Sequence, residues 1–384
     1  RSFFQYKDAV QELVRGVAEA YWNLAQARTE RWARQIQTDV SEEQFRREEA
    51  RLKLGLANRG DEAQARLTYH QFRSALVAAQ ALVLAREGAL RNLLGLAPSD
   101  GRAIVPSSPP ASLRYKQDWK ALVKLAEERR PDIIELKLIL EADQQRLLQA
   151  ENRALPRLDA QALYRWNGLE GEAPNGQRVS GGPGQFTDWT LAVNFSVPLG
   201  LREGRARVRQ ASLVIARDRA NLDQGLHNAA HAVAVTVRDL DSAYQQYLAL
   251  RLTRQAASEN LEVQIANRRI GRAIYLDTLR ALQAWGDAVN AESAALLSYN
   301  TQLANLERQT GTILETHGLV FAEERFQAAG PLGKHFPREY PGSVSAVGDP
   351  KRYPPDEVKE NALGLKRPDL GKAMEGLPLP RKEK

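Results

Sequence analysis

Hydrophobic residues recur at helical spacing over the first part of the chain. They step by three and four positions at Val10, Leu13, Val14, Val17, Tyr21 and Leu24. This period predicts an amphipathic helix over about residues 6–54. Its apolar seam later thins to Trp32, Ile36 and Val40 among many charged residues, which is typical of a coiled coil whose other faces meet water. Turn residues follow, and a second helix is predicted over about residues 62–94.

The second half of the chain has the same texture at greater length. A heptad seam runs through Leu226, Ala230, Val233, Val237, Leu240, Tyr244 and Tyr247. It predicts a helix over about residues 203–269, roughly 100 Å long at 1.5 Å per residue. A turn at Gly271 separates it from a partner helix over about 275–313, where Leu282, Val289, Leu296 and Leu303 lie seven apart. Both halves therefore predict long antiparallel helical hairpins.

A different period appears in the stretch DWTLAVNFSVPLG, residues 188–200. Apolar residues alternate there with Thr190, Asn194 and Ser196, and the alternating apolar set includes Trp189, Leu191, Val193 and Phe195. Period two predicts a strand with two unlike faces. The stretch LDAQALYRW, residues 158–166, alternates similarly except at Leu163, and a Gly-rich polar loop joins the two. The sequence therefore predicts a β-hairpin within residues 156–199.

The two helical hairpins match each other at an offset of 216 positions. At this offset Gly55 aligns with Gly271, Asp61 aligns with Asp277, and Gly95 aligns with Gly311. A repeat of this kind indicates duplicated halves, although chance similarity between two coiled coils is the alternative. The second half carries a helix and a strand pair before its long hairpin. The copy of these elements would precede residue 1, so we expect the sequence to lack them, together with any signal peptide.

These patterns predict an organisation into two repeats and a tail. The expected parts are a first-repeat helical hairpin in residues 1–97, a linker in 98–117, a second repeat in 118–316 with β-hairpin 156–199 and long helical hairpin 203–315, and a Pro/Gly-rich tail in 317–384. The tail lacks a sustained period and is expected to be disordered.

Composition excludes several classes of function. The chain has no cysteine, and its net charge of +7 comes from basic residues interspersed with acids, unlike the clusters of a nucleic-acid binder. The sequence contains no run of 18 apolar residues, so it predicts no membrane-spanning helix. His227 and His231 have helical zinc-site spacing, but Asn228 replaces the expected Glu and no third ligand is suggested. No nucleophile–base constellation stands out. We therefore expect no enzyme activity, no cofactor and no metal site.

The predicted strands have the length that a bilayer crossing requires at barrel tilt. Two strands cannot span a membrane alone, because their edges would leave backbone groups unpaired in lipid. They would have to join strands of other copies around a symmetry axis. The alternative is a hairpin packed on a soluble sheet or helix layer, since alternation fits both.

Several motifs together carry a resemblance to a known family. They are AEAYWNLAQA near residue 20, LRNLLGLAP, RPDI, the strand ALPRLDAQALY, FTDWTLAVNFSVPLG, GRAIYLDTLRA and LERQTGTIL. In order and spacing they resemble the outer membrane efflux proteins, or outer membrane factors of the tolC type, over about residues 5–316. The resemblance implies a mainly α fold with a small β part. A homotrimer would form a twelve-stranded transmembrane β-barrel, continued by an α-barrel of coiled-coil hairpins.

The resemblance also implies a function. The chain would be an outer-membrane channel subunit of a tripartite efflux pump or type I secretion system, passively conducting substrates from periplasm to exterior. Its partners would be a membrane-fusion adaptor and an inner-membrane pump, in the outer membrane of a bacterial cell and extending into the periplasm. The alternative is a soluble periplasmic coiled-coil adaptor or scaffold with a small β domain.

Finally, the resemblance implies site residues. The helix turns would be adaptor-docking tips, formed by Gly55, Leu56 and Ala57 and by Gly271, Arg272 and Ala273. Asp277, with Asp61 as its first-repeat counterpart, would line the pore gate, where symmetry-related carboxylates select cations. Arg280 replaces a second family carboxylate, so an Asp277–Arg280 ion pair is another way to hold the gate shut. Trp189, Leu191, Val193 and Phe195 would face lipid. The alternatives are that the glycines only cap helices and that the charges lie on a solvated helix face.

Overall fold

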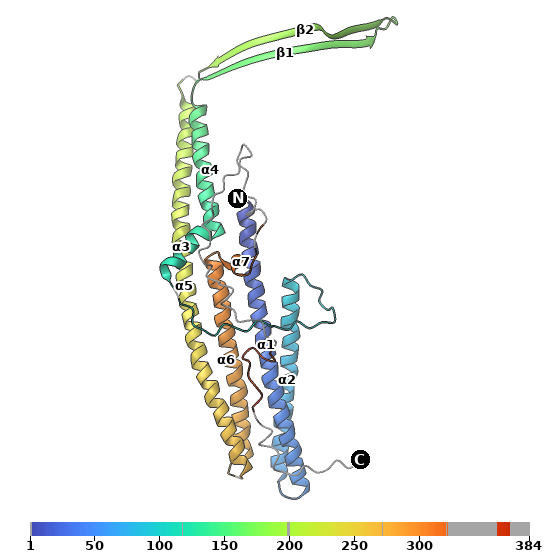
Figure 1. Ribbon diagram of the computed structural model, residues 1–384, viewed down its shortest axis with the longest axis vertical. Helices are drawn as coiled ribbons and strands as arrows, with labels where there is room; N and C mark the ends of the chain where they lie inside the picture. Colours follow the sequence, from blue (N-terminus) through green and yellow to red (C-terminus); the bar gives the residue numbers. More distant parts are fainter. Residues whose placement is uncertain are drawn as a thin grey trace. The chain divides into compact units, whose positions relative to one another are not determined.

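The computed structural model describes residues 2–116, 118–197, 200–270, 272–319, 321 and 359–368. The described elements, in chain order, are α1 (Ser2–Lys53), α2 (Arg59–Leu93), α3 (Trp119–Arg129), α4 (Pro131–Arg153), β1 (Arg157–Glu172), β2 (Arg178–Ser196), α5 (Arg202–Arg269), α6 (Tyr275–Gln309) and α7 (Ile313–Thr316) (Figure 1). The strands form one antiparallel pair. The prediction of a mainly α fold with a small β part is therefore confirmed.

The helix boundaries carry the internal repeat. Helices α1 and α5 end at Lys53 and Arg269, which are 216 positions apart. Helices α2 and α6 both have 35 residues, and both their first and their last residues differ by the same 216 positions. Gly95 and Gly311 follow these helices with φ of 67° and 72°. Equivalent residues therefore start and stop equivalent helices, which chance similarity of heptads does not require.

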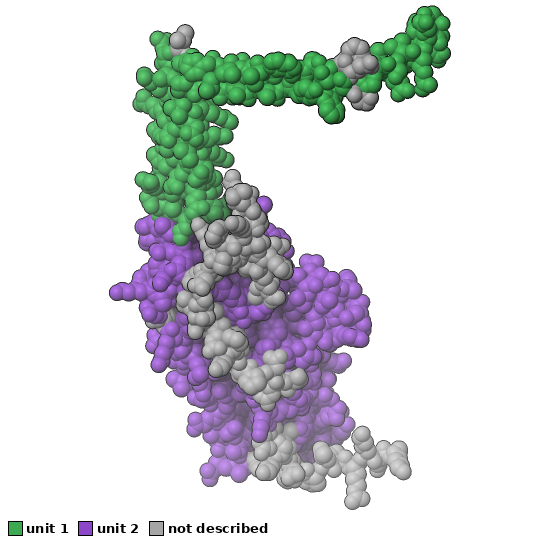
Figure 2. Space-filling model, turned by 45° about the horizontal axis from the view of Figure 1, so that its top comes forward, with its two compact units in different colours: residues 1, 134–225 green, residues 2–133, 226–384 purple. Residues whose placement is uncertain are grey.

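The chain divides into two compact units (Figure 2). One comprises residues 134–225 and contains most of α4, the strand pair and the first part of α5. The other comprises residues 2–133 together with the described residues from 226 onwards.

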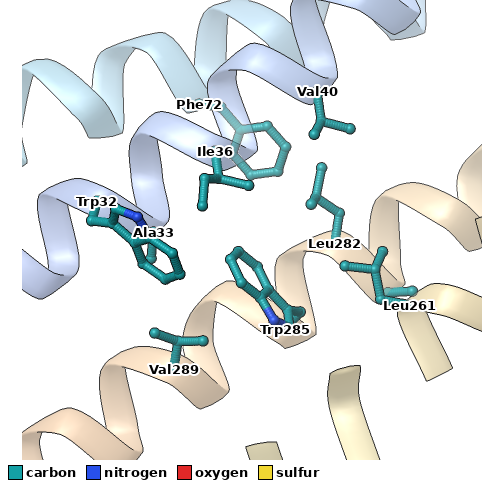
Figure 3. Close-up of a cluster of buried hydrophobic side chains, with 10 residues drawn as sticks. Trp32, Ala33, Ile36, Val40, Phe72, Leu261, Leu282, Trp285 and Val289 are labelled. Carbon is teal, nitrogen blue, oxygen red and sulfur yellow. The ribbon is translucent and has the colours of Figure 1, made fainter. Parts of the chain in front are cut away.

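The core of the second unit lies where the two helical hairpins meet. Helix α1 packs against both α2 and α6. The largest cluster brings together Trp32, Ala33, Ile36 and Val40 of α1, Phe72 of α2, Leu261 of α5 and Ala281, Leu282, Trp285 and Val289 of α6 (Figure 3). The ring centroids of Trp32 and Trp285 are 6.0 Å apart. The thin seam of α1 is therefore the surface that joins the hairpins.

Polar groups also cross this seam. Gln37 is fully buried, and its Nε2 donates to the carbonyl of Leu282 at 3.1 Å. A Cβ at Gly286 would overlap the Gln37 side chain, so glycine permits the close approach of α1 and α6 here. Arg34 forms an ion pair with Asp287 at 3.3 Å.

The linker predicted for residues 98–117 is bound along its described part to all four long helices. Its partners on the helices are Arg91 of α2 (to Arg102), Arg28 of α1 (to Ile104), Tyr21 of α1 (to Ser108), Asn300 of α6 (to Ala111), Tyr299 of α6 (to Leu113 and Tyr115) and Asp241 of α5 (to Arg114). We call this segment the crossing linker. Its backbone groups have no ladder, so helix side chains satisfy them.

Part of the tail departs from the prediction of disorder for residues 317–384. Residues 359–368 form a turn with side chains packed on the helices, whereas residues 322–358 and 369–384 lie outside the described residues. Leu363 and Leu365 supply the apolar contact. A search for sustained period misses so short a segment.

Candidate functional sites at the strand pair and the helix turns

The pairing register of β1 and β2 brings the two alternating patterns into phase. Directly opposed residues of an antiparallel pair lie on the same face. The opposed pairs are Leu158 with Phe195, Ala160 with Val193, Ala162 with Leu191, and Tyr164 with Trp189. The face that they form is apolar throughout. Trp189, Leu191, Val193 and Phe195 are 65–73% exposed, so none of the described residues covers them.

The opposite face of the hairpin is mostly polar. Asp159 lies opposite Asn194, and Arg165 lies opposite Asp188 at 4.0 Å. Leu163, the residue that breaks the alternation, lies on this face opposite Thr190. The hairpin therefore offers one apolar and one mostly polar surface, with Leu163 and Ala192 as apolar residues on the polar one.

The apolar face ends in aromatic side chains at a change of register. The even-numbered positions from 158 to 166 span about 26 Å at roughly 3.3 Å per residue. Tyr164 and Trp166, both exposed, have ring centroids 6.2 Å apart. The pairing then shifts between Asn167 and Leu169. An apolar band of about 25 Å bounded by aromatic residues is what a transmembrane β-barrel presents to lipid. Among the described residues, none of the helices is apolar over a length sufficient for a membrane crossing.

The first helix turn is closed by a glycine cap. Gly55 has φ of 74°, its N–H donates to Leu52, and the N–H of Leu56 donates to the carbonyl of Arg51 at 2.8 Å. This is a Schellman motif, so Gly55 does cap α1. Leu56 is exposed and Ala57 is half-buried. Asp61 donates its N–H to the capping side chain at the start of α2, and its carboxylate is exposed.

The second turn repeats part of this geometry. The N–H of Arg272 donates to the carbonyl of Asn267, five residues earlier, at 2.8 Å. In the first turn, Leu56 and Arg51 form the equivalent hydrogen bond. Gly271 itself lies outside the described residues. Arg272 is exposed and Ala273 half-buried, and the flanking Ile270 and Ile274 are 60% and 64% exposed.

The carboxylate expected at the gate lies just after this turn. Asp277 is half-buried in the first turn of α6, and Arg280 is exposed. The ion pairs among described residues do not include one between these two side chains. Within a single chain, the i, i+3 bridge considered from the sequence is therefore not formed.

Close to the two turns is a buried charged cluster that the sequence did not single out. The Glu48 carboxylate of α1, whose side chain is only 4% exposed, accepts from Arg268 of α5 at 2.9 Å and pairs with Arg51 at 3.4 Å. The Arg268 guanidinium lies 4.6 Å from the ring centroid of Tyr275 of α6. Burial lowers the pKa of Arg268 and raises the pKa of Tyr275 to about 12. We call Glu48, Arg268 and Tyr275 the tip cluster.

The tip cluster joins the first hairpin to the second. Its signal was hidden because Glu48 stands in the run SEEQFRREEARLK, which has the composition of a solvated helix face. Only the packing of α5 and α6 on α1 distinguishes this carboxylate from its neighbours. No group of three or more potential metal ligands is present among the residues described, and His227 and His231 stand as a pair with ring centroids 4.4 Å apart.

Comparison with known proteins decides the family. Residues 4–96 and 122–312 match the family model described as outer membrane efflux protein. The chain belongs to this family. The two matched ranges follow the two repeats. The resemblance stated from the sequence is confirmed, and the chain is that of an outer membrane protein of an efflux family rather than of an enzyme family.

Individual relatives agree with this assignment. The chain is 24% identical over 332 residues to the outer membrane protein TolC of Escherichia coli K12, covering 81% of this chain and 63% of that protein. The chain thus spans less than two thirds of the length of the curated relatives that it matches.

Solved structures share the fold. The MtrE outer membrane channel of Neisseria gonorrhoeae, described in its open state, has a TM-score of 0.63 at 20% identity, with 82% of this chain and 69% of that chain covered. The outer membrane protein VceC of Vibrio cholerae has a TM-score of 0.59 at 18% identity, with coverages of 80% and 72%.

Proposed function

We propose that this chain is a subunit of a passive outer-membrane channel that serves a tripartite efflux pump or a type I secretion system. Family membership supports the proposal, and the phase of the strand pair carries it. Apolar residues of both strands share one exposed face, while the other face is mostly polar. Such a hairpin is suited to a wall with lipid on one side and water on the other. A soluble adaptor has no use for so large an uncovered apolar face.

Closure of the wall requires several copies. The strand pair has two free edges, which cannot remain unpaired in lipid. The helical unit has a corresponding need, because α2 and α5 flank α1 and α6 and carry exposed apolar side chains. These are Leu67, Val77 and Leu84 on α2 and Val235, Leu252 and Val263 on α5. A ring in which α2 of one copy packs on α5 of the next would cover both sets. We propose that the ring is a homotrimer whose helices form an α-barrel and whose strands form a β-barrel, and membership of the outer membrane efflux protein family supports this.

The helix turns are the proposed docking site for a membrane-fusion adaptor, which links the channel to an inner-membrane pump. The residues concerned are Gly55, Leu56, Ala57, Gly271, Arg272 and Ala273. Support comes from the exposed Leu56 and from Ile270 and Ile274, because apolar side chains around a glycine cap allow another backbone to pack closely.

The proposed pore gate lies next to the turns. Asp277, Arg280 and Asp61 would form charged rings in a trimer, and rings of carboxylates favour cations. The tip cluster would set the spacing of the two hairpins behind these rings, since Glu48 belongs to one hairpin and Arg268 to the other.

The test uses the full-length protein in detergent and in planar lipid bilayers. The channel should require detergent for solubility, run as a trimer in light scattering and give discrete conductance steps. A monomer that stays in solution without detergent would support the adaptor alternative.

A matched pair of variants tests the faces of the hairpin. Val193→Arg places a charge on the apolar face and should block insertion, at a cost of about 2–4 kcal/mol near the bilayer midplane. Asn194→Arg, the adjacent position on the polar face, should insert normally. Equal insertion of both variants would refute the assignment of the faces.

A further inference from the structure

Residues 359–368 form a turn that is closed by one buried side chain. Asn361 is 3% exposed, and its Oδ1 accepts from the N–H of Leu365 at 2.9 Å while its Nδ2 donates to the carbonyl of Leu365 at 2.8 Å. The N–H of Gly364, whose φ is 62°, donates to the carbonyl of Asn361 at 3.1 Å. The segment therefore has a defined shape of its own, held by polar groups whose hydrogen bonds are satisfied.

Polar contacts fix this turn along α1. The N–H of Ala362 donates to the Thr29 hydroxyl at 3.0 Å, and Trp32 Nε1 donates to the Glu360 carboxylate at 3.2 Å. Arg367 pairs with Asp39 of α1 at 3.4 Å. Thr29 is fully buried, and its hydroxyl also donates to the carbonyl of Ala25, so accepting from Ala362 completes its hydrogen bonding. These anchors extend over about 15 Å of helix.

Apolar contacts of the same turn reach both hairpins. Ala362 packs on the cluster of Trp22 and Ala25 of α1 with Leu297 of α6. Leu363 packs on the cluster that contains Tyr247 of α5 with Ala295 and Leu296 of α6. Leu363 and Leu365 also cover the cluster at which the hairpins meet. The turn therefore bridges the two hairpins and does not decorate one of them.

We propose that residues 359–368 are a releasable clasp between the α1–α2 hairpin and the α5–α6 hairpin, whose release favours channel opening. This inference rests on the proposed function, because it assumes that conduction requires the hairpins to move apart. If α5–α6 moves relative to α1, either Leu363 loses its contacts with α5 and α6 or the neighbouring Ala362 loses its hydrogen bond to Thr29. Clasp binding and hairpin separation are therefore linked, and any partner that captures the segment would favour the separated state by the same free energy.

The first experiment locks the clasp by a disulfide. Residues 1–384 contain no cysteine, so Thr29→Cys with Ala362→Cys introduces one cysteine pair among them, at a site where a side-chain oxygen already lies 3.0 Å from the opposite backbone nitrogen. In planar bilayers, the oxidised full-length channel should open several-fold less often than after reduction, and each single-cysteine variant should not respond to reductant. Equal opening of the oxidised and reduced double variant, with the bridge verified by mass spectrometry, would overturn the proposal.

A second experiment reports on the clasp without conduction. Cysteine at Leu363 should react with a maleimide several-fold more slowly than cysteine at the exposed Lys359, and Thr29→Val, which removes the hydroxyl acceptor, should bring the two rates together. Equal rates in the parent protein would overturn the clasp whatever the channel does. Slow labelling of Leu363→Cys in a protein that never conducts would instead refute the proposed function and leave the segment bound as described.

Discussion

The tip cluster provides the sharpest test of how the hairpins are held together. Replacing Arg268 by Met removes the cation but keeps an apolar stem, so Glu48 is left with Arg51 as a cationic neighbour at a longer 3.4 Å. Breaking a buried ion pair by removing one partner costs about 3–5 kcal/mol. Arg268 retains 18% exposure and Arg51 compensates in part, so we expect the lower end, about 3 kcal/mol.

A double-mutant cycle separates the pair from its surroundings. Glu48→Gln with Arg268→Met leaves no buried charge and should cost less than the sum of the two single changes by about 1.5 kcal/mol or more. Loss of the guanidinium from the Tyr275 ring adds about 0.5–2 kcal/mol to every variant that lacks Arg268, and it cancels in the cycle.

Hydrogen exchange followed by mass spectrometry measures the effect where it occurs. In Arg268→Met, amides of α1 and α5 next to the turns should exchange about a hundredfold faster, which corresponds to about 3 kcal/mol of local opening free energy. The control is Arg46→Met, which breaks an exposed i, i+4 pair with Glu42 and should change the rates less than about threefold. A response of Arg268→Met no larger than that of the control would refute the view that this pair ties the hairpins together.

Three further predictions concern other residues. Gly311→Ala should destabilise the protein by about 2–4 kcal/mol in thermal unfolding, because φ is 72° and a Cβ would lie 2.7 Å from backbone atoms at the end of α3. Its repeat counterpart Gly95→Ala, with open space around it, should cost about 1 kcal/mol. Equal costs would contradict the packing at Gly311. The pKa of Tyr275 is raised to about 12 in the folded state, so its contribution to stability is complete below pH 10 and is lost as pH rises from 10 to 12. Tyr275→Phe should abolish that part of the alkaline loss of stability in a pH series of unfolding midpoints. An unchanged profile would exclude Tyr275 as its source. Asp277→Ala combined with Arg280→Ala should raise single-channel conductance if these side chains line the gate, and unchanged conductance would remove them from it.

The regular elements were predictable because their periods are long and consistent. The α1 seam through Trp32, Ile36 and Val40 is the surface that meets α6, and its spacing shows this directly. Alternation located the two strands but not their inner ends, since β1 continues to Glu172 and β2 begins at Arg178, within the stretch predicted as a Gly-rich loop. Their register was not predictable, because the alternation within each strand is the same whichever residues of the two strands face each other. Only the pairing shows that Leu158 lies opposite Phe195, which places the apolar residues of both strands on one face.

Polar contacts between distant segments were not predictable. Glu48 and Arg268 lie in charged runs whose composition is that of solvated faces, and burial depends on a neighbouring helix. The crossing linker reads as a string of turn formers, yet helix side chains such as Asn300 bind its backbone. The turn at residues 359–368 is too short for any period to appear. In each case the deciding partner is far away in the sequence.

The crossing linker holds the long helices at one point along their length, about which they could tilt. It binds α6 at Asn300, and 25 residues, about 38 Å of helix, separate that point from Tyr275 at the other end of the same helix. A tilt of only about 5° about the bound point would displace the far end by about 3 Å, roughly the width of a water molecule. The helices can thus act as levers. A slight rotation about the segment that the linker binds produces a large displacement at the far helix end, while the contacts with the linker scarcely move.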